Sequence, residues 1–220
     1  MADQVKGGPV KRRSYDASRR QAGAQRRREA VLDSAREIFL SDGFTRTTVA
    51  AIARGAGVSQ ETVYKTFGGK PGLVEALYRR ALRGAGPVPA YERSDRLRST
   101  PDPREVVRGW SRLATEVGPR VSAIHLLVRD AVIVDATLKP LLDELDADRL
   151  ARMAENAQFL ESAGHLREGV DAEKAADLMW AVTAPEVIEI LVFRRGWSLD
   201  RYAEFIYDTL TNGLLRPTAT

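Results

Sequence analysis

The stretch Val49–Tyr64 reads VAAIARGAGVSQETVY, and it decides the fold of the first third of the chain. The small side chains of Ala53 and Ala56 allow two short helices to cross closely. Gly57 tolerates the positive φ angle that a tight turn between them requires. Ser59 can cap the second helix, because its hydroxyl can accept hydrogen bonds from the first N–H groups of that helix. The stretch therefore predicts a helix-turn-helix.

Amphipathic segments flank this motif. Before Gly43, apolar residues recur at helical spacing: Val31, Leu32, Ala35, Ile38 and Phe39. Thr47 or Thr48 can cap the first helix of the motif. A further helix is expected to begin near Lys70, with Pro71 at its first position, where the missing N–H costs nothing. Residues 28–83 are therefore predicted to form a small helical domain.

The rest of the chain also shows helical periodicity. Residues 84–102 are rich in glycine and proline and predict a linker or loop. Helical patterns follow at residues 103–118, 121–135, 138–164, 171–195 and 198–215. Pro185 lies inside the fourth of these segments and is expected to kink it. Because no stretch shows the two-residue period of a strand, the sequence predicts an all-α fold with a larger helical domain over residues 103–216.

Charge is distributed unevenly along the 220 residues. Residues 1–83 carry 17 Lys and Arg against 8 Asp and Glu, whereas residues 84–220 carry 17 against 22. Residues 1–27 are rich in arginine and poor in large apolar groups, so we expect them to form a disordered basic arm. This asymmetry predicts a module that binds a polyanion, with nucleic acid as the first candidate and an anionic membrane surface as the second.

Several classes of protein and site are excluded. The chain has no cysteine, which excludes a disulfide scaffold, a thiol nucleophile and thiolate zinc sites. No apolar run approaches the roughly 18 residues that span a bilayer. The first 30 residues contain no apolar h-region, so we expect no secretory signal and a cytoplasmic location without membrane contact. The motifs HExxH, GxSxG, GxGxxG and Walker A are absent. We therefore expect no enzyme, no catalytic residue, no metal site and no cofactor.

The second helix of the motif carries the residues that would read DNA. In a helix-turn-helix the N-terminal end of this helix enters the major groove. There Gln60 can bond adenine, Glu61 can accept from cytosine, and Thr62 can contact polar groups or the thymine methyl group. The candidate DNA-binding set, including phosphate contacts, is Thr48, Ser59, Gln60, Glu61, Thr62, Tyr64, Lys65 and Lys70.

The run from Arg28 to Leu77 resembles the TetR family of bacterial transcriptional regulators. The resemblance rests on Val31-Leu32, Ala35, Ile38-Phe39, Gly43-Phe44, Thr47-Thr48-Val49, Ile52-Ala53, Ala56-Gly57-Val58-Ser59, Thr62-Val63-Tyr64, Phe67, Lys70 and Leu73. Gly68-Gly69 and Pro71 depart from the family's usual pattern. Near the other end of the chain, Arg195-Gly196-Trp197-Ser198 resembles the turn before the family's last helix.

The resemblance implies nine or so helices, a homodimer on a pseudo-palindromic operator in double-stranded DNA, and a small-molecule effector that releases the protein. The helices that resemble the family's pocket walls carry Trp110, His125, Arg129, Met153, Phe159, Met179, Trp180 and Thr183. Their composition suits a hydrophobic or aromatic effector with one or two polar groups. The last two helical segments offer a broad apolar face for dimerisation, at Val187, Ile190, Leu191, Tyr202, Phe205, Ile206 and Leu210.

Together these features predict a ligand-responsive, sequence-specific transcriptional repressor. One alternative is a regulator that acts through a protein partner and has lost operator recognition. A second is a membrane-surface protein that uses the basic arm. Both alternatives predict that selective DNA binding is absent.

Overall fold

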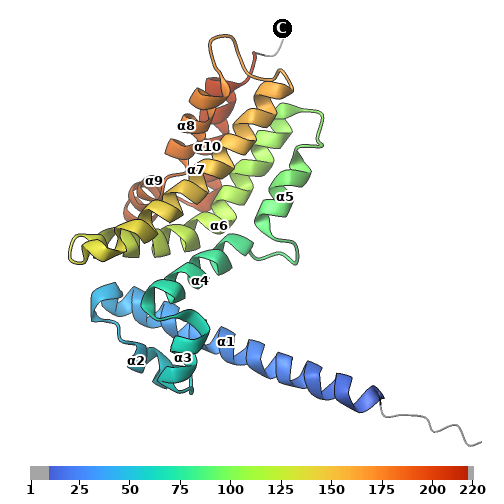
Figure 1. The fold of residues 1–220 in the computed structure, drawn as a ribbon. Helices are drawn as coiled ribbons and strands as arrows, with labels where there is room; N and C mark the ends of the chain where they lie inside the picture. The colour runs from blue at the N-terminus through green and yellow to red at the C-terminus, as the bar shows by residue number, and fades with distance from the viewer. Residues whose placement is uncertain (1–9, 218–220) are drawn as a thin grey trace, which may run out of the picture.

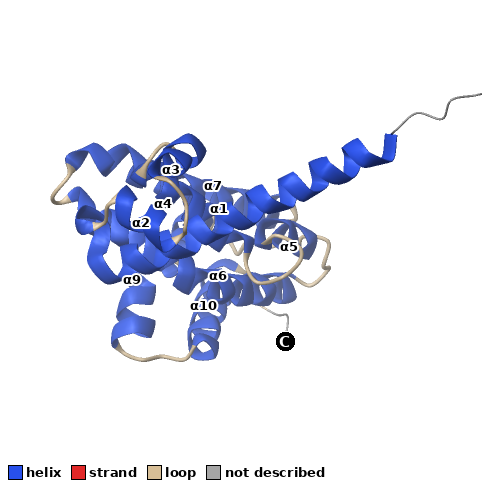
Figure 2. Ribbon diagram, turned by 90° about the horizontal axis from the view of Figure 1, so that it is seen from below, coloured by secondary structure: helices blue, strands red, loops and turns tan. Residues whose placement is uncertain are grey.

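A computed structural model describes residues 10–217, with side chains from residue 19 onward. The described chain is helical throughout (Figure 1). Its helices are α1 (Val10–Arg46), α2 (Val49–Gly55), α3 (Gln60–Phe67), α4 (Lys70–Arg83), α5 (Ala90–Leu97), α6 (Pro103–Val132), η1 (Ala136–Leu138), α7 (Lys139–Ser162), α8 (Ala172–Val182), α9 (Pro185–Ile188), η2 (Glu189–Arg194) and α10 (Leu199–Leu214). Between residues 10 and 217 the only strand-like pairing is an isolated bridge between Leu166 and Leu215, and Figure 2 shows no strand. The predicted all-α class is confirmed.

Two buried clusters organise the helices. The first joins α1–α4 to the C-terminal half of α6, through side chains such as Phe39, Leu73 and Val128 that are wholly buried. The second lies among α6, α7, α8 and α10 and includes Leu160 and Met179. Figure 1 shows α1–α4 below and the remaining helices above, with α4 leading from one group to the other. Because α6 contributes to both clusters, the two groups of helices share one continuous element.

The beginning of α1 differs from the prediction. We expected residues 1–27 to be disordered, but the structure extends α1 back to Val10; residues 1–9 lie outside the described residues. Arginine, glutamine and alanine dominate this segment and are good helix formers, so propensity favours a helix without a buried face. Gln25 also donates to Glu29 at 2.7 Å, one turn further along. Helix propensity therefore outweighs the lack of apolar surface from which disorder was expected.

Two further boundaries are corrected. The segment 84–102, predicted as a linker, contains α5, because Ala90 and Ser94 are buried against the rest of the chain. α6 runs without interruption through Pro119, where the sequence predicted a break. Packing of α6 on both sides outweighs the local cost of a proline inside a helix. Pro185 does separate two helices as expected, because it is the first residue of α9.

A partly buried ion pair holds the loop between α4 and α5. Arg93 on α5 donates two hydrogen bonds of 2.7 Å to the carboxylate of Glu116 on α6. The same carboxylate accepts a hydrogen bond of 2.8 Å from the backbone N–H of Ala85. The hydrogen bonds from Arg93 and then from Ala85 lower the pKa of Glu116 to about 2. The pair therefore ties the end of α4 and the start of α5 to α6.

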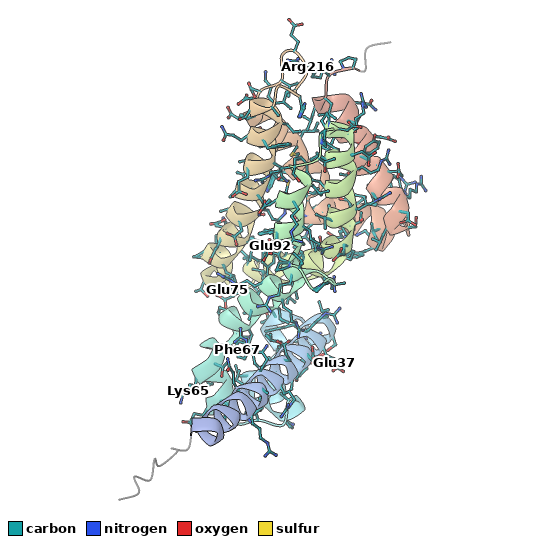
Figure 3. The ribbon with its side chains drawn as sticks, turned by 90° about the vertical axis from the view of Figure 1, so that its right-hand side faces the viewer. Glu37, Lys65, Phe67, Glu75, Glu92 and Arg216 are labelled. Atoms are coloured by element: carbon teal, nitrogen blue, oxygen red, sulfur yellow. The ribbon has the colours of Figure 1, made fainter. Side chains whose placement is uncertain are left out.

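We predict that Glu116→Gln destabilises the protein at pH 7 by about 1–3 kcal/mol, because a charge-assisted hydrogen-bond pair is lost. The pKa of Glu116 is lower in the folded chain than its usual value, so its contribution is complete above pH 5 and is lost as the pH falls toward 2. Denaturant unfolding of both proteins at pH 7 and pH 3 measures the difference, which should shrink at pH 3. Glu92→Gln, at an exposed position on α5 (Figure 3), is the control. An equal difference at both pH values would contradict the assignment.

Candidate nucleic-acid interface and cavity

Helices α2 and α3 form the predicted helix-turn-helix. The backbone N–H of Val58 donates to the carbonyl of Ala53 at 3.0 Å and closes the turn. Gly57 lies between them with a φ of 65°, as expected for a residue that must adopt the left-handed region. Ser34 of α1 donates through Oγ to the carbonyl of Ile52 at 3.0 Å. This bond fixes α2 against α1, so the position of α3 follows from the packing of the whole group.

Two predicted site residues act as helix caps. Thr48 Oγ1 accepts a hydrogen bond from Ala51 N at 3.1 Å at the start of α2. Ser59 Oγ accepts from Thr62 N at 3.2 Å and lies 2.9 Å from Thr62 Oγ1. The hydroxyl groups of Thr48, Ser59 and Thr62 are thus engaged within the chain. They shape the N-terminal ends of the two helices, where backbone N–H groups favour an anion.

The remaining α3 residues lie on an open face. Gln60, Glu61, Tyr64 and Lys65 are exposed, and the Tyr64 side chain is 54% accessible. Val63 points the other way and is wholly buried in the first cluster. Figure 3 places Lys65 on the outside of this end of the molecule. The structure therefore brings four predicted contacts together on one face of a short helix.

Lys70 does not belong to this face. Its Nζ donates to the backbone carbonyl of Phe44 at 2.8 Å and lies 4.4 Å from the centre of the Phe44 ring. Burial lowers the pKa of Lys70, an effect that the charge of Asp135 partly opposes. The prediction of a phosphate contact at Lys70 is corrected: its side chain holds the end of α1 to the start of α4. No local sequence pattern indicates this contact, because Phe44 is 26 residues away.

The first part of α1 runs beside α3. The Arg28 guanidinium lies 4.6 Å above the Phe67 ring, and a surface groove between the helices is lined by Gln21, Ala24 and Arg27 of α1 and by Thr62 and Thr66 of α3, among others. Figure 3 shows this segment in front of Phe67 and Lys65. Arg19, Arg26 and Arg27 are exposed here. The basic segment found in the sequence is thus a helix adjacent to the candidate DNA-binding face.

A cavity of about 100 Å³ lies in the upper group of helices. Four of the eight predicted pocket residues line it: Trp110, Met153, Met179 and Thr183. The walls also include residues that sequence reasoning missed: Ala90, Tyr91, Ser94, Leu113, Ala114, Val117, Arg152, Asn156, Ile206 and Leu210. The first three belong to α5, and no signal pointed to them because their segment was interpreted as a linker.

The other four predicted pocket residues lie outside this cavity. His125 and Arg129 lie toward the C-terminal end of α6. His125 Nε2 is 2.9 Å from Asp146 Oδ1, and Arg129 forms ion pairs with Glu186 and Glu189. Phe159 packs edge-on against the Trp110 ring at 6.2 Å between centroids. Trp180 lies beneath the Arg149 guanidinium, 5.2 Å from the ring centre. These side chains support the helices around the cavity and do not line it.

Some residues of the predicted dimer surface are buried within the chain, and others are exposed. Tyr202, Ile206 and Leu210 are buried within the chain, and Ile206 and Leu210 line the cavity, so the prediction for these three is corrected. Val187, Leu191 and Phe205 are half-buried, while Ile190 is 51% exposed. Phe193 and Leu199, nearby in the chain, are 47% and 41% exposed. An apolar surface therefore remains on η2 and the start of α10.

The described residues contain no cluster of three or more His, Asp or Glu that could hold a metal ion. Within the same part of the chain, no helix combines the length and the apolar character needed to cross a bilayer.

Comparison with known proteins shows similarity to bacterial transcriptional regulators. The sequence model described as bacterial regulatory proteins, tetR family, matches residues 31–77. The regulator AlkX of Mycobacterium tuberculosis is 37% identical over 73 residues, which are 33% of this chain and only 32% of that relative. The repressor BepR of Brucella suis is 24% identical over 90% of this chain and 97% of its own length.

A solved structure shares the whole fold. The complex of triclosan with SmeT, a protein from Stenotrophomonas maltophilia, superposes with a TM-score of 0.68 at 22% identity, over 87% of this chain and 93% of that one. The motif match covers the helix-turn-helix, and the relatives and the fold extend the likeness over most of the chain. Residues 31–77 therefore carry the helix-turn-helix segment of the tetR family of bacterial regulatory proteins, and the chain as a whole is similar to regulators of that family in sequence and in fold.

Proposed function

We propose that this regulator is a dimeric, sequence-specific repressor that a small effector releases from a pseudo-palindromic operator. The observation that carries the proposal is the open face of α3, where Gln60, Glu61, Tyr64 and Lys65 are exposed together on a helix capped by Ser59. In the major groove, Gln60 and Glu61 would meet base edges, whereas Tyr64 and Lys65 would contact phosphates. The basic start of α1 would add phosphate contacts beside them.

Repression and release are supported by relatives and by the connection between cavity and motif. BepR is named a repressor, and SmeT has been solved with triclosan. In this chain α5 supplies one wall of the cavity, and a short loop joins α5 to α4. An effector that shifts α5 would act on α4 through this loop. Release then requires only that the effector binds more tightly to the conformer whose two α3 helices misfit the DNA.

Dimerisation would place two α3 helices about 34 Å apart, so that they read successive turns of the major groove. The apolar surface of Ile190, Phe193 and Leu199, with half-buried Val187, Leu191 and Phe205, supports a self-complementary interface. Exposed apolar groups gathered on one surface are typical of such contacts.

We predict that Gln60→Ala weakens operator binding by about 1–3 kcal/mol and relaxes base preference at one position per half-site. Lys65→Ala should weaken binding to all sequences and reduce the slope of log K against log salt by about one per bound subunit. Fluorescence anisotropy at several salt concentrations measures both effects. Lys70→Met is the matched control: it also removes one lysine charge, but from a half-buried side chain whose Nζ is bonded to the carbonyl of Phe44, so the slope should not change. Equal slopes for Lys65→Ala and wild type would contradict the docking orientation.

We predict that Phe193→Glu converts the dimer into a folded monomer at micromolar concentration, because two carboxylates would be buried against an apolar partner surface. Sedimentation velocity measures the mass, and circular dichroism checks the helical content. Ile133→Glu, at the most exposed large apolar residue of the described chain, should leave the mass unchanged. A dimer that persists in Phe193→Glu would place the interface elsewhere.

The proposed function as a whole is tested by selecting bound sequences from a random DNA pool. We expect a pseudo-palindrome with nanomolar affinity and a steep salt dependence. A pool without an enriched motif would favour a regulator that acts through a protein partner. Binding of anionic vesicles by the chain, with no selected DNA, would favour the membrane-surface alternative.

A further inference from the structure

One buried polar side chain in the proposed effector cavity is hydrogen-bonded to the protein through one end of its amide group, and the other end is available to a ligand. We propose that the effector is a small, electrically neutral and mostly apolar molecule with one hydrogen-bond-accepting oxygen, and that the side-chain amide of Asn156 receives this oxygen. This inference rests on the proposed function, because it takes the cavity to be the effector site.

The orientation of Asn156 follows from its neighbour. Asn156 lines the cavity and is only 4% exposed. Arg98 Nη2 lies 2.9 Å from its Oδ1. A guanidinium can only donate hydrogen bonds, so the amide oxygen must face Arg98 and the NH₂ group must face away from it. The hydrogen bond with Arg98, which uses only the amide oxygen, is the one found for this side chain among the described residues, so the NH₂ group is available for a further hydrogen-bond partner. A ligand acceptor in the cavity would supply it.

The charges at this end of the cavity indicate that the ligand is neutral. Arg152 lines the cavity, and its Nη1 lies 2.6 Å from Asp95 Oδ1 and 3.1 Å from Glu155 Oε2. Arg98 Nη2 lies 3.4 Å from the same oxygen of Asp95 and 3.5 Å from the same oxygen of Glu155. Two guanidinium groups thus face two carboxylates. Both described guanidinium groups at this end of the cavity are thus paired and do not offer a free positive charge to an anionic ligand, and a cationic ligand would have to displace an arginine.

The other polar side chains that line the cavity are consistent with Asn156 as the main hydrogen-bond partner of the ligand. Trp110 Nε1 donates to the carbonyl of Ser94 at 3.2 Å, and Thr183 Oγ1 donates to the carbonyl of Met179 at 2.8 Å. The Tyr91 hydroxyl is protonated at neutral pH, as a phenol normally is, and burial raises its pKa further. It can therefore support a ligand oxygen by donating a second hydrogen bond. Leu113, Val117, Met153 and Leu210 complete an apolar wall.

The volume limits the ligand's size. The cavity holds about 100 Å³, whereas an engineered apolar cavity of about 150 Å³ takes benzene. The cavity is also open on one side, so a ligand somewhat larger than this volume can bind with part of it toward the surface. A single ring or a short branched chain is the upper size class, and acetophenone is a suitable probe. Its isostere α-methylstyrene replaces the carbonyl oxygen with a CH₂ group and keeps the shape.

The experiment measures binding of both probes by NMR of protein labelled with ¹³C at the methionine methyl groups. The chain has three methionines, and two of them, Met153 and Met179, line the cavity, so their signals report binding at this site. The readout is the ratio of the acetophenone Kd to the α-methylstyrene Kd in each protein. The different cost of removing the two probes from water cancels when this ratio is compared between proteins.

We expect Asn156→Leu and Asn156→Asp, which keep the side chain's size and remove its donor, each to raise this ratio about fivefold or more. Asn156→Asp retains an acceptor for Arg98 and so separates loss of the donor from loss of the Arg98 contact. Asn212→Asp, at the chain's only other asparagine and on the exposed side of α10, should leave the ratio unchanged. Benzoate, the anionic analogue, should not shift the two methionine signals.

An unchanged ratio in both Asn156 variants, with both probes still shifting Met153 and Met179, would overturn the amide anchor and leave the effector cavity standing. Tighter binding of benzoate than of acetophenone would overturn the neutral class. If neither probe shifts the two signals, the inference fails at the level of the cavity. Repressor function is judged separately by the DNA selection, so the two failures are distinguishable.

Discussion

The packing of α4 against the C-terminal half of α6 is the constraint on which the rest of the structure depends. Helices α1–α4 do not enclose a core of their own, because Val121, Ile124 and Val128 of α6 lie in the same buried cluster as Phe39 and Leu73. A domain of about 60 residues buries only a modest fraction of its surface, so these side chains supply stability that the motif would otherwise lack. The orientation of α3 is therefore set by α6 as much as by the helix-turn-helix itself.

The same helix carries the cavity. Trp110, Leu113 and Val117 line it from the N-terminal half of α6, one to three turns before the residues that enter the first cluster. α6 is continuous across this distance, and an uninterrupted helix transmits a displacement with little loss. The second route runs through α5 and the Arg93–Glu116 pair to the end of α4. Both routes end at α4, which is the element that a ligand must move to reposition α3.

The sequence predicted local structure well and long-range packing poorly. The caps at Thr48 and Ser59, the positive φ at Gly57 and the start of α4 depend on neighbours within four residues, so residue type alone indicates them. The position of the Lys70 side chain depends on Phe44, and the burial of Tyr202 depends on Val182. The Tyr202 hydroxyl donates a hydrogen bond of 2.6 Å to the backbone carbonyl of Val182. Such contacts join distant parts of the chain, and a helical period shows that a face is apolar without showing what covers it.

The predicted pocket residues that lie outside the cavity have a common role in helix packing. His125 bonds Asp146 across α6 and α7, and Arg149 donates to the carbonyl of Trp180 at 3.1 Å across α7 and α8. Arg149 is buried, and desolvation lowers its pKa, so its charge must be compensated by acceptors in fixed positions. An apolar interface tolerates small shifts along the helix axes, whereas these directional bonds do not. The polar residues beside the cavity therefore fix the register of the helices that form its walls, and with it the position of Asn156 on α7.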